Sequence, residues 1–487
     1  MTFARKLFKK LIHNPNKIWI MDDNKNISYG QVLADIDLLK EKFSKNTLNL
    51  KHKVIGIAMK TSYDFIIADL ICLKEQAITL PIPLEFDNTQ IKSLLNNVQI
   101  ILVRNDSDMN RLTSILPKKP IMNVMSGKMH KGNNTHTMEC PNLLHNITKI
   151  IHTSGTTSNP KGVLIKDESL NILVHNLLNV FPKNPLTYLS LVPLSLLVEQ
   201  IFGIYCTLLS DGKLILPPES LADFGGYESD SEAYLDLIRK YQPNFMYLAP
   251  RLLEDLNKLA SIEGFKKDAY YITGGAKINH ETLKKLDHKG IKIYEGYGLS
   301  ETTSVVSING PDDRRIGTAG KILPHLNYKI NEGELLLKGS TICAGYFTKD
   351  ESSCDIDEEG YLHTGDLVEI DEDRYLTIKG RKKNLLILSN ARNISPEWVE
   401  SKLKHHNVIE DCIILGDGKD FLTALILGAK PSKITSIIHK VNSELPNFAQ
   451  IQNSINIPDI EKFKRKYFTV TGRPRRSLIH KEYINDL

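Results

Sequence analysis

Residues 153–162 read Thr-Ser-Gly-Thr-Thr-Ser-Asn-Pro-Lys-Gly, a run crowded with hydroxyl groups and glycines. Such a loop can offer backbone N–H groups and hydroxyls to phosphate oxygens, and Lys161 adds a positive charge. The run lacks the G-x-x-x-x-G-K-[ST] pattern, so it is not a P-loop. Taken alone, it is consistent with either a phosphate-binding loop or a flexible polar turn.

A second chemistry-bearing segment, 294–302, reads Tyr-Glu-Gly-Tyr-Gly-Leu-Ser-Glu-Thr. Glu301 offers the hard oxygen ligands that suit Mg²⁺. Tyr297 could stack on a base, and Ser300 could donate to a phosphate. Further along the chain, Asp366 is a suitable acceptor for the vicinal hydroxyls of a ribose. Together with the 153–162 loop, these residues predict a nucleotide site.

Alternating strands and helices are expected to position this site. The apolar runs that we interpret as strands are 54–59, 78–84, 100–103 and 149–154. Residues 61–76 have helical spacing of their apolar positions. Strand–helix alternation is typical of parallel sheets covered by helices, so we predict an α/β fold.

The pattern changes after about residue 316. Short β-like runs with Gly and Asp continue to 379, and a helix (394–406) and two strands follow the Gly-Arg-Lys-Lys sequence at 380–383. We predict a large N-terminal domain of parallel or mixed sheets, 1–379, and a small α+β domain, 380–487. The active site is expected between them.

Composition excludes several classes of protein. The chain has 487 residues and a net charge of +5, from 62 basic and 57 acidic residues, which is far from a dedicated nucleic-acid binder. No pair among the six cysteines has the spacing of a zinc or redox motif, and scattered thiols are typical of a reducing cytoplasm. The basic run 462–476 suits phosphates or an acidic carrier protein better than nucleic acid, and a solvated loop is an equal alternative.

No apolar stretch is long enough to span a membrane. Residues 3–12 form a weakly amphipathic basic segment, for which we expect a solvated first helix. Peripheral membrane docking of this helix is the open alternative.

The ordered motifs resemble the adenylate-forming superfamily, which includes acyl- and aryl-CoA ligases, luciferases and the adenylation domains of peptide synthetases. The matches are T-S-G-T-T-G-x-P-K-G at 153–162 with Ser158 for Gly, Y-G-x-T-E at 297–301 with Ser300 for Thr, T-G-D at 364–366, and G-R-x-K/D at 380–383. The resemblance covers almost the whole chain.

This resemblance implies a two-step reaction with ATP, Mg²⁺ and CoA. A carboxylate attacks the α-phosphate of ATP, and a thiol then displaces AMP from the acyl adenylate. Fixed donors and cations must neutralise the charge that develops when two anions meet.

The resemblance also implies a role for each site residue. Ser300 would contact phosphate, Glu301 would hold Mg²⁺, and Lys383 would be the hinge of the small domain. Asp366 and Arg381 would hold the ribose. The other implied contacts are Thr153, Ser154, Gly155, Thr156, Thr157 and Lys161 for the phosphates, and Gly274, Gly275, Ala276, Tyr297 and Gly298 for adenine.

The sequence departs from the family pattern at three positions. Arg473 stands where the adenylation lysine is expected, in the loop 469–476, and we predict that it bridges the substrate carboxylate and the α-phosphate. Ala391 stands near a position where many members have glycine at the pantetheine arm of CoA. Leu196 replaces the histidine of the P-L-x-H-x-x-E pattern of long-chain ligases.

We therefore expect an acid–thiol ligase (AMP-forming) of the long-chain fatty acid–CoA ligase type, which activates a medium- or long-chain fatty acid. The apolar run 186–209 is predicted to be mostly core, with a few residues lining a pocket for an aliphatic tail. The closest alternative is an acyl-AMP ligase that loads a separate acyl carrier protein. A non-catalytic adenine-nucleotide-binding protein is the alternative from another class.

Overall fold

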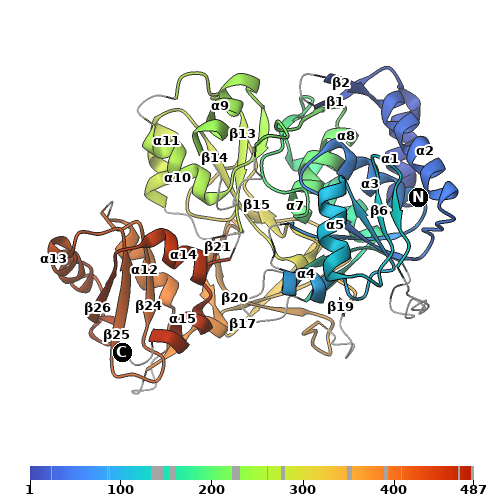
Figure 1. Cartoon of the computed structure of the whole chain (residues 1–487). Helices are drawn as coiled ribbons and strands as arrows, with labels where there is room; N and C mark the ends of the chain where they lie inside the picture. Colours follow the sequence, from blue (N-terminus) through green and yellow to red (C-terminus); the bar gives the residue numbers. More distant parts are fainter. Residues whose placement is uncertain are drawn as a thin grey trace.

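The structure is a computed structural model. It describes residues 1–22, 25–84, 86, 88–132, 144, 146–152, 161–221, 231–259, 262–275, 280–347, 354–388, 393–406, 408–469 and 472–483. Figure 1 shows the N-terminus and the C-terminal part at opposite ends of the molecule.

Two large mixed sheets with parallel centres organise most of the chain. Among the described residues, one has nine strands in the order β16 (Lys321–Ile322), β15 (Ser307–Ile308), β14 (Ile293–Tyr297), β13 (Tyr270–Thr273), β12 (Phe245–Tyr247), β10 (Thr187–Leu189), β11 (Lys213–Ile215), β1 (Ile18–Asp22) and β2 (Lys25–Ser28). The other, again counted over the described part, has eight: β19 (Tyr346–Phe347), β9 (Gly162–Lys166), β8 (Ile147–His152), β4 (Ile78–Pro81), β3 (Val54–Ala58), β5 (Ile100–Val103), β6 (Ile121–Asn123) and β7 (Met129–His130).

Smaller sheets follow toward the C-terminus. In the described ranges they are β17 (Leu326–Asn331), β18 (Glu334–Gly339), β20 (Leu362–Ile370) and β21 (Leu376–Arg381), then the pair β22 (Leu386–Ile387) and β23 (Asn393–Ile394), and finally β24 (Asp411–Leu415), β25 (Leu422–Leu427) and β26 (Ile451–Ile457). β24 and β25 pair antiparallel, whereas β25 and β26 pair parallel.

Helices flank these sheets (Figure 1). In chain order they are α1 (Phe3–His13), α2 (Tyr29–Lys45), α3 (Tyr63–Lys74), α4 (Asn88–Leu95), α5 (Asp106–Ile115), α6 (Asp167–Val180), α7 (Leu197–Glu199), the π-helix η2 (Gln200–Cys206), α8 (Thr207–Leu209), α9 (Ser231–Tyr241), α10 (Pro250–Lys258), α11 (His280–His288), α12 (Pro396–Lys404), α13 (Pro431–Asn442), α14 (Ile460–Tyr467) and α15 (Arg476–Tyr483). Short 3₁₀ turns are η3 (Ser300–Thr302), η4 (Lys382–Asn384) and η5 (Asn447–Ala449).

Local sequence explains the central elements. All five residues of β3, Val-Ile-Gly-Ile-Ala, are buried, as expected of a strand covered on both faces. α3 begins after Ser62, whose hydroxyl accepts the Phe65 N–H at 3.3 Å and caps the helix. The predicted α/β fold with a small C-terminal α+β part is confirmed. The division at residue 379/380 stays a prediction, and β21 continues to Arg381.

The expectation of a solvated first helix holds for one face only, since Arg5 and Lys9 are exposed whereas the apolar face is buried. In α1, Phe3, Leu7 and Leu11 repeat every four residues, and all three are buried in the main hydrophobic core. Residues four apart lie on one helix face, so a short segment forms a complete apolar stripe. Membrane docking of this helix would depend on these three apolar side chains, which are packed in the core instead.

The basic run 462–476 makes internal ion pairs. Both terminal nitrogens of Arg476 donate to the Glu400 carboxylate, at 2.8 and 2.7 Å, and Lys464 pairs with Glu410 at 2.8 Å. Arg476 is thus held by a largely buried carboxylate, whereas the Lys464 pair lies at the surface.

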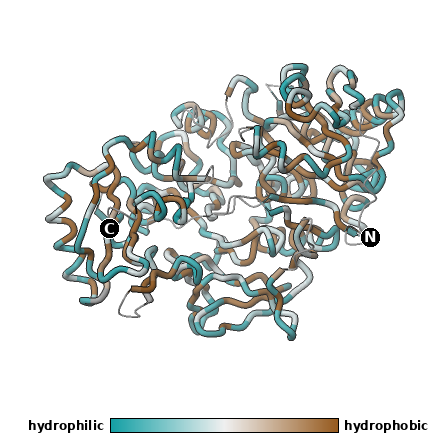
Figure 2. Tube along the Cα trace, turned by 60° about the horizontal axis from the view of Figure 1, so that its bottom comes forward, coloured by the Kyte–Doolittle hydropathy of each residue, from teal (hydrophilic) through white to brown (hydrophobic). Residues whose placement is uncertain are grey.

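In Figure 2, hydrophobic segments are frequent in the interior of the molecule and hydrophilic segments at its periphery. No helix within the described ranges is long and apolar enough to cross a membrane.

Candidate active site

The carboxyl ends of β12, β13 and β14 form one edge of the nine-stranded sheet. These strands run parallel, with Phe245 beside Tyr270 and Tyr271 beside Ile293. At the edge, the Tyr247 hydroxyl donates to the Gly274 carbonyl at 2.8 Å. Ligands of open α/β sheets bind at the carboxyl ends of the strands, so this edge is the candidate site.

Glycines at this edge permit close backbone approach. A Cβ at Gly298 would lie 1.5 Å from the Ser304 carbonyl oxygen, and one at Gly274 would lie 2.6 Å from that of Gly296. No side chain fits at either position, which explains why the two segments carry glycine there.

Asp366 is the fixed anion of the site. Its side chain is 4% exposed, and its Oδ1 accepts from Arg381 Nε at 2.6 Å. Its Oδ2 accepts from the Tyr297 hydroxyl at 2.5 Å and from Arg381 Nη2 at 3.2 Å. Burial raises the pKa of Asp366, although Arg381 and Tyr297 oppose that shift. A carboxylate has about four lone-pair sites, so Oδ1 can accept one further donor, such as a hydroxyl.

Glu301 lies in η3, on the loop after β14. Its Oε1 accepts from the Tyr346 hydroxyl at 3.0 Å, and its backbone carbonyl accepts from the Cys343 N–H at 2.8 Å. The Lys161 ammonium lies 4.8 Å from the centroid of the same Tyr346 ring. Glu301 and Lys161, which belong to different motifs, therefore both contact Tyr346.

Arg473 reaches this edge from the C-terminal part. Its Nε donates to the Gly275 carbonyl at 2.7 Å, and its Nη2 donates to the same oxygen. Desolvation by the surrounding protein, and then the charge of Arg381, lower the pKa of Arg473, while Asp366 acts in the opposite direction. The predicted adenylation residue thus lies beside the segment predicted to frame adenine.

Lys383 follows directly after β21, in η4. Partial burial, and then the charge of Arg381, lower the pKa of its amine. The charges of Asp366 and Glu301 act in the opposite direction.

Several predicted residues lie outside the described residues. These are Thr153, Ser154, Gly155, Thr156 and Thr157 of the phosphate loop, together with Ala276 and Ala391. Of the remaining predictions, Ser300 begins η3 directly before Glu301, and Gly298 lies between β14 and η3.

Sequence reasoning missed Tyr247 and Tyr346. Neither stands in a motif that we had singled out, and their partners Gly274 and Glu301 lie 27 and 45 residues away. It also missed the disulfide between Cys343 and Cys354, because a spacing of eleven residues matches no redox or metal motif.

The run 186–209 is core, as predicted for most of its residues. Tyr188, Leu194 and Ile201 are fully buried. The buried Glu199 carboxylate accepts from the Tyr188 hydroxyl at 2.7 Å and from the Ser190 hydroxyl at 2.6 Å. Glu199 therefore joins Tyr188 and Ser190 by hydrogen bonds inside the core.

The described residues contain no group of three or more His, Cys, Asp or Glu side chains that could hold a metal by themselves. Mg²⁺ is usually bound by one or two carboxylates together with substrate phosphates and water. Glu301, a single carboxylate that contacts the same tyrosine as Lys161, fits that mode of binding.

Glu295, on β14, gives a pH-dependent prediction. Burial raises its pKa from 4.5 to about 7, although it accepts the Gly317 N–H at 2.9 Å and lies near Arg314. The folded state therefore keeps a proton that the unfolded state releases, and stability falls as pH rises from 4.5 to about 7. Above that range, Glu295→Gln should be more stable than wild type by up to about 3 kcal/mol.

Urea unfolding of both proteins at pH 5 and pH 8 measures this difference. The advantage of the variant should shrink at pH 5, where the wild-type carboxyl is largely protonated. An advantage that is the same at both pH values would contradict the assignment of the titration to Glu295.

Comparison with family models places the chain among known proteins. The model described as AMP-binding enzyme matches residues 7–347, and that described as AMP-binding enzyme C-terminal domain matches residues 383–486.

Relatives of known name match parts of the chain. The Mycobacterium bovis protein named long-chain-fatty-acid–CoA ligase FadD15 is 38% identical over 156 residues, which cover 32% of this chain and 26% of that protein. The Homo sapiens protein named long-chain-fatty-acid–CoA ligase ACSBG1 is 35% identical over 179 residues, 35% of this chain and 25% of that protein. The matched region thus spans about a quarter of each relative.

Solved structures share the fold over nearly the full length. The o-succinylbenzoate CoA synthetase MenE of Bacillus subtilis, in complex with its acyl-adenylate intermediate, has a TM-score of 0.81 at 17% identity and covers 97% of both chains.

Proposed function

The chain belongs to the AMP-binding enzyme family, and on that premise we propose that it activates a carboxylic acid with ATP, through an acyl adenylate, to a thioester of CoA. We propose further that the acid is a medium- or long-chain fatty acid, and that residues 1–379 and 380–487 act as two domains around the site.

One observation carries this proposal. Arg473, from the C-terminal part, meets the Gly275 carbonyl at the sheet edge where Asp366 and Tyr297 are also held. A cation, a fixed carboxylate and a glycine-lined edge are thus assembled from both parts of the chain.

In the first step, a carboxylate oxygen of the acid bonds to the α-phosphorus of ATP, and the bond to pyrophosphate breaks. Negative charge increases on the α-phosphate oxygens as the two anions meet, so a fixed cation there lowers the barrier. Arg473 is the residue that we assign to this role. Its two donors on one carbonyl hold the guanidinium in a defined orientation beside the site.

The other residues orient the nucleotide. Asp366 would accept the ribose hydroxyls while Arg381 and Tyr297 hold its carboxylate in place. Glu301 would hold Mg²⁺, which when bound supplies charge neutralisation at the phosphates. Ser300, the 153–157 hydroxyls and Lys161 would contact phosphate, while Gly274–Ala276 and Gly298 would frame adenine.

In the second step, the thiol sulfur of CoA bonds to the acyl carbon and AMP leaves. Lys383, after β21, is the proposed hinge about which the C-terminal part turns between the steps. The names of partially matching relatives support a fatty acid as substrate and CoA as acceptor. Each buried methylene of an alkyl tail contributes about 0.8 kcal/mol, which favours long acids in an apolar pocket.

Product analysis by mass spectrometry tests the proposal. The protein is given ATP, Mg²⁺ and a pool of fatty, aryl and amino acids, with and without CoA. We expect acyl-CoA for a subset of fatty acids. Acyl adenylate that persists in the presence of CoA would instead favour loading of a separate carrier protein. No adenylate despite nucleotide binding would favour a non-catalytic binding protein.

A further inference from the structure

Residues 341–347, which we call the bridging segment, lie between η3 and β9. Each of these elements adjoins a motif that is predicted to bind phosphate. On one side, the Cys343 N–H donates to the Glu301 carbonyl at 2.8 Å, and the Thr303 hydroxyl donates to the Thr341 carbonyl at 2.7 Å. These bonds fix the bridging segment against η3.

On its other side, the bridging segment pairs with β9, the strand that leaves the phosphate loop. The Ala344 N–H donates to the Leu164 carbonyl, and the Leu164 N–H donates to the Gly345 carbonyl, each at 3.0 Å. β19 then continues antiparallel to β9, with Phe347 beside Gly162. The segment therefore holds η3 and β9 at a fixed separation.

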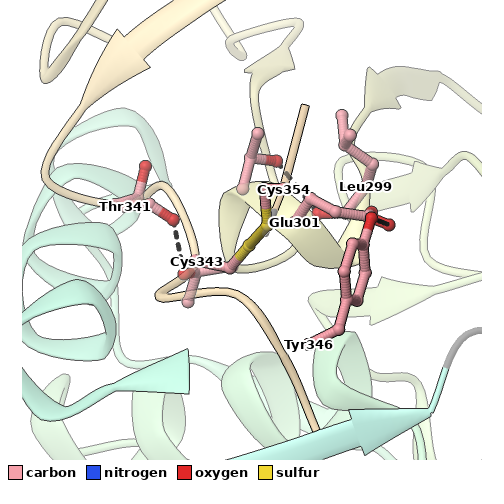
Figure 3. Close-up of a disulfide and its surroundings, with 8 residues drawn as sticks. Leu299, Glu301, Thr341, Cys343, Tyr346 and Cys354 are labelled. Atoms are coloured by element: carbon pink, nitrogen blue, oxygen red, sulfur yellow. Dashed lines mark hydrogen bonds between the residues drawn. A yellow bond between two sulfur atoms is a disulfide. The ribbon is translucent and has the colours of Figure 1, made fainter. Parts of the chain in front are cut away.

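Tyr346 is the side chain that links the two loops directly. Its hydroxyl donates to Glu301 Oε1 at 3.0 Å, and the Lys161 ammonium lies 4.8 Å from its ring centroid. Figure 3 shows the Tyr346 and Glu301 side chains next to each other, beside the disulfide between Cys343 and Cys354. That disulfide closes the loop in which Tyr346 stands.

We propose that Tyr346 is a positioning residue, which orients the Glu301 carboxylate for Mg²⁺ and holds Lys161 beside it for the phosphates of ATP. This inference rests on the proposed function.

The geometry gives Tyr346 two separable effects. A hydroxyl bond to Oε1 restricts the rotation of the carboxylate and leaves Oε2 for a metal ion. A tyrosine hydroxyl is protonated at neutral pH, so it can donate to the carboxylate. The ring face attracts the ammonium of Lys161 independently of the hydroxyl.

The test is the Mg²⁺-dependent gain in ATP affinity, measured by isothermal titration of the full chain with ATP in EDTA and in Mg²⁺. Tyr346→Phe removes only the hydroxyl. We expect the ratio of the two dissociation constants to fall about fivefold, while the dissociation constant in EDTA changes by less than about twofold. Tyr346→Leu also removes the ring, so it should weaken ATP binding in EDTA as well.

Tyr361→Phe is the matched control. The Tyr361 ring also has a lysine over it, since Lys329 lies 4.4 Å from its centroid, but its contacts are with a different part of the chain. The control should keep the wild-type ratio, and all variants should keep the wild-type melting temperature. An unchanged ratio in Tyr346→Phe, or an equal fall in the control, would overturn the inference.

The same titration separates this inference from the proposed function. Wild-type protein that binds ATP with a Mg²⁺-dependent gain but makes no adenylate would refute the proposed function, and the ratio in Tyr346→Phe would still decide the inference. Wild-type protein without that gain in ATP affinity would refute the inference directly.

Discussion

Replacing Arg473 by alanine is expected to lower the rate of pyrophosphate release by about 100- to 1,000-fold, the effect of removing one fixed donor from a developing anion. The guanidinium donates twice to the Gly275 carbonyl, at the edge where Asp366 and Tyr297 also meet. Pyrophosphate release with a saturating acid, measured under single-turnover conditions, gives the rate of this step.

The second half-reaction is the internal control for this variant. When acyl adenylate is supplied with CoA, no bond to the α-phosphorus is formed, so Arg473→Ala should lose much less activity. Arg473→Lys keeps the charge without the planar fork, and we expect an intermediate rate. Equal losses in both half-reactions would show that Arg473 supports the structure of the site rather than the attack on phosphorus.

The family resemblance predicted residues that the structure brings together, although their roles at the nucleotide stay predictions. Asp366 and Arg381 were predicted to act together, and the structure pairs them through the antiparallel register of β20 and β21, in which they are direct partners. Strand predictions such as 54–59 were accurate because residues in a parallel sheet are buried on both faces, which gives continuous apolar runs. Here local pattern and tertiary structure agree.

The missed features depend on contacts between distant segments. Tyr346 meets Glu301 across 45 residues only because β19 pairs with β9 and aligns the bridging segment with η3. A tyrosine after Ala-Gly carries no local signal of that pairing. Likewise, the basic residues of α1 suggested a solvated helix, since periodicity could not show which core its three apolar residues would enter.

A buried ion pair behind the phosphate loop was also invisible in the sequence. Lys149, on β8, pairs with Asp69 of α3, and both side chains are fully buried. Lys149 also donates to the Thr79 hydroxyl at 3.1 Å, and the Tyr205 hydroxyl donates to Asp69 at 2.6 Å. The network joins α3, β4, β8 and η2 just before the chain enters the phosphate loop.

Asp69→Ala is therefore expected to destabilise the protein by about 3–5 kcal/mol, because it leaves the Lys149 charge buried without its counter-ion. Trp19 lies in the same hydrophobic core as Tyr205, whereas Trp398, the other of the two tryptophans, lies in the C-terminal part. Urea unfolding followed by Trp19 fluorescence in a Trp398→Phe background reports on this core.

The comparison that isolates the cause is with an apolar replacement of the whole network, Asp69→Leu with Lys149→Met and Tyr205→Phe. Removing both charges and the Tyr205 hydroxyl together leaves no unpaired charge and, of this network, only the neutral Thr79 hydroxyl. This variant should therefore be close to wild type in stability, although it changes more atoms. Thr79→Val, which removes one hydrogen bond, should cost about 1 kcal/mol. A triple variant as unstable as Asp69→Ala would contradict this explanation. The core would then depend on the shape of these side chains and not on their charge.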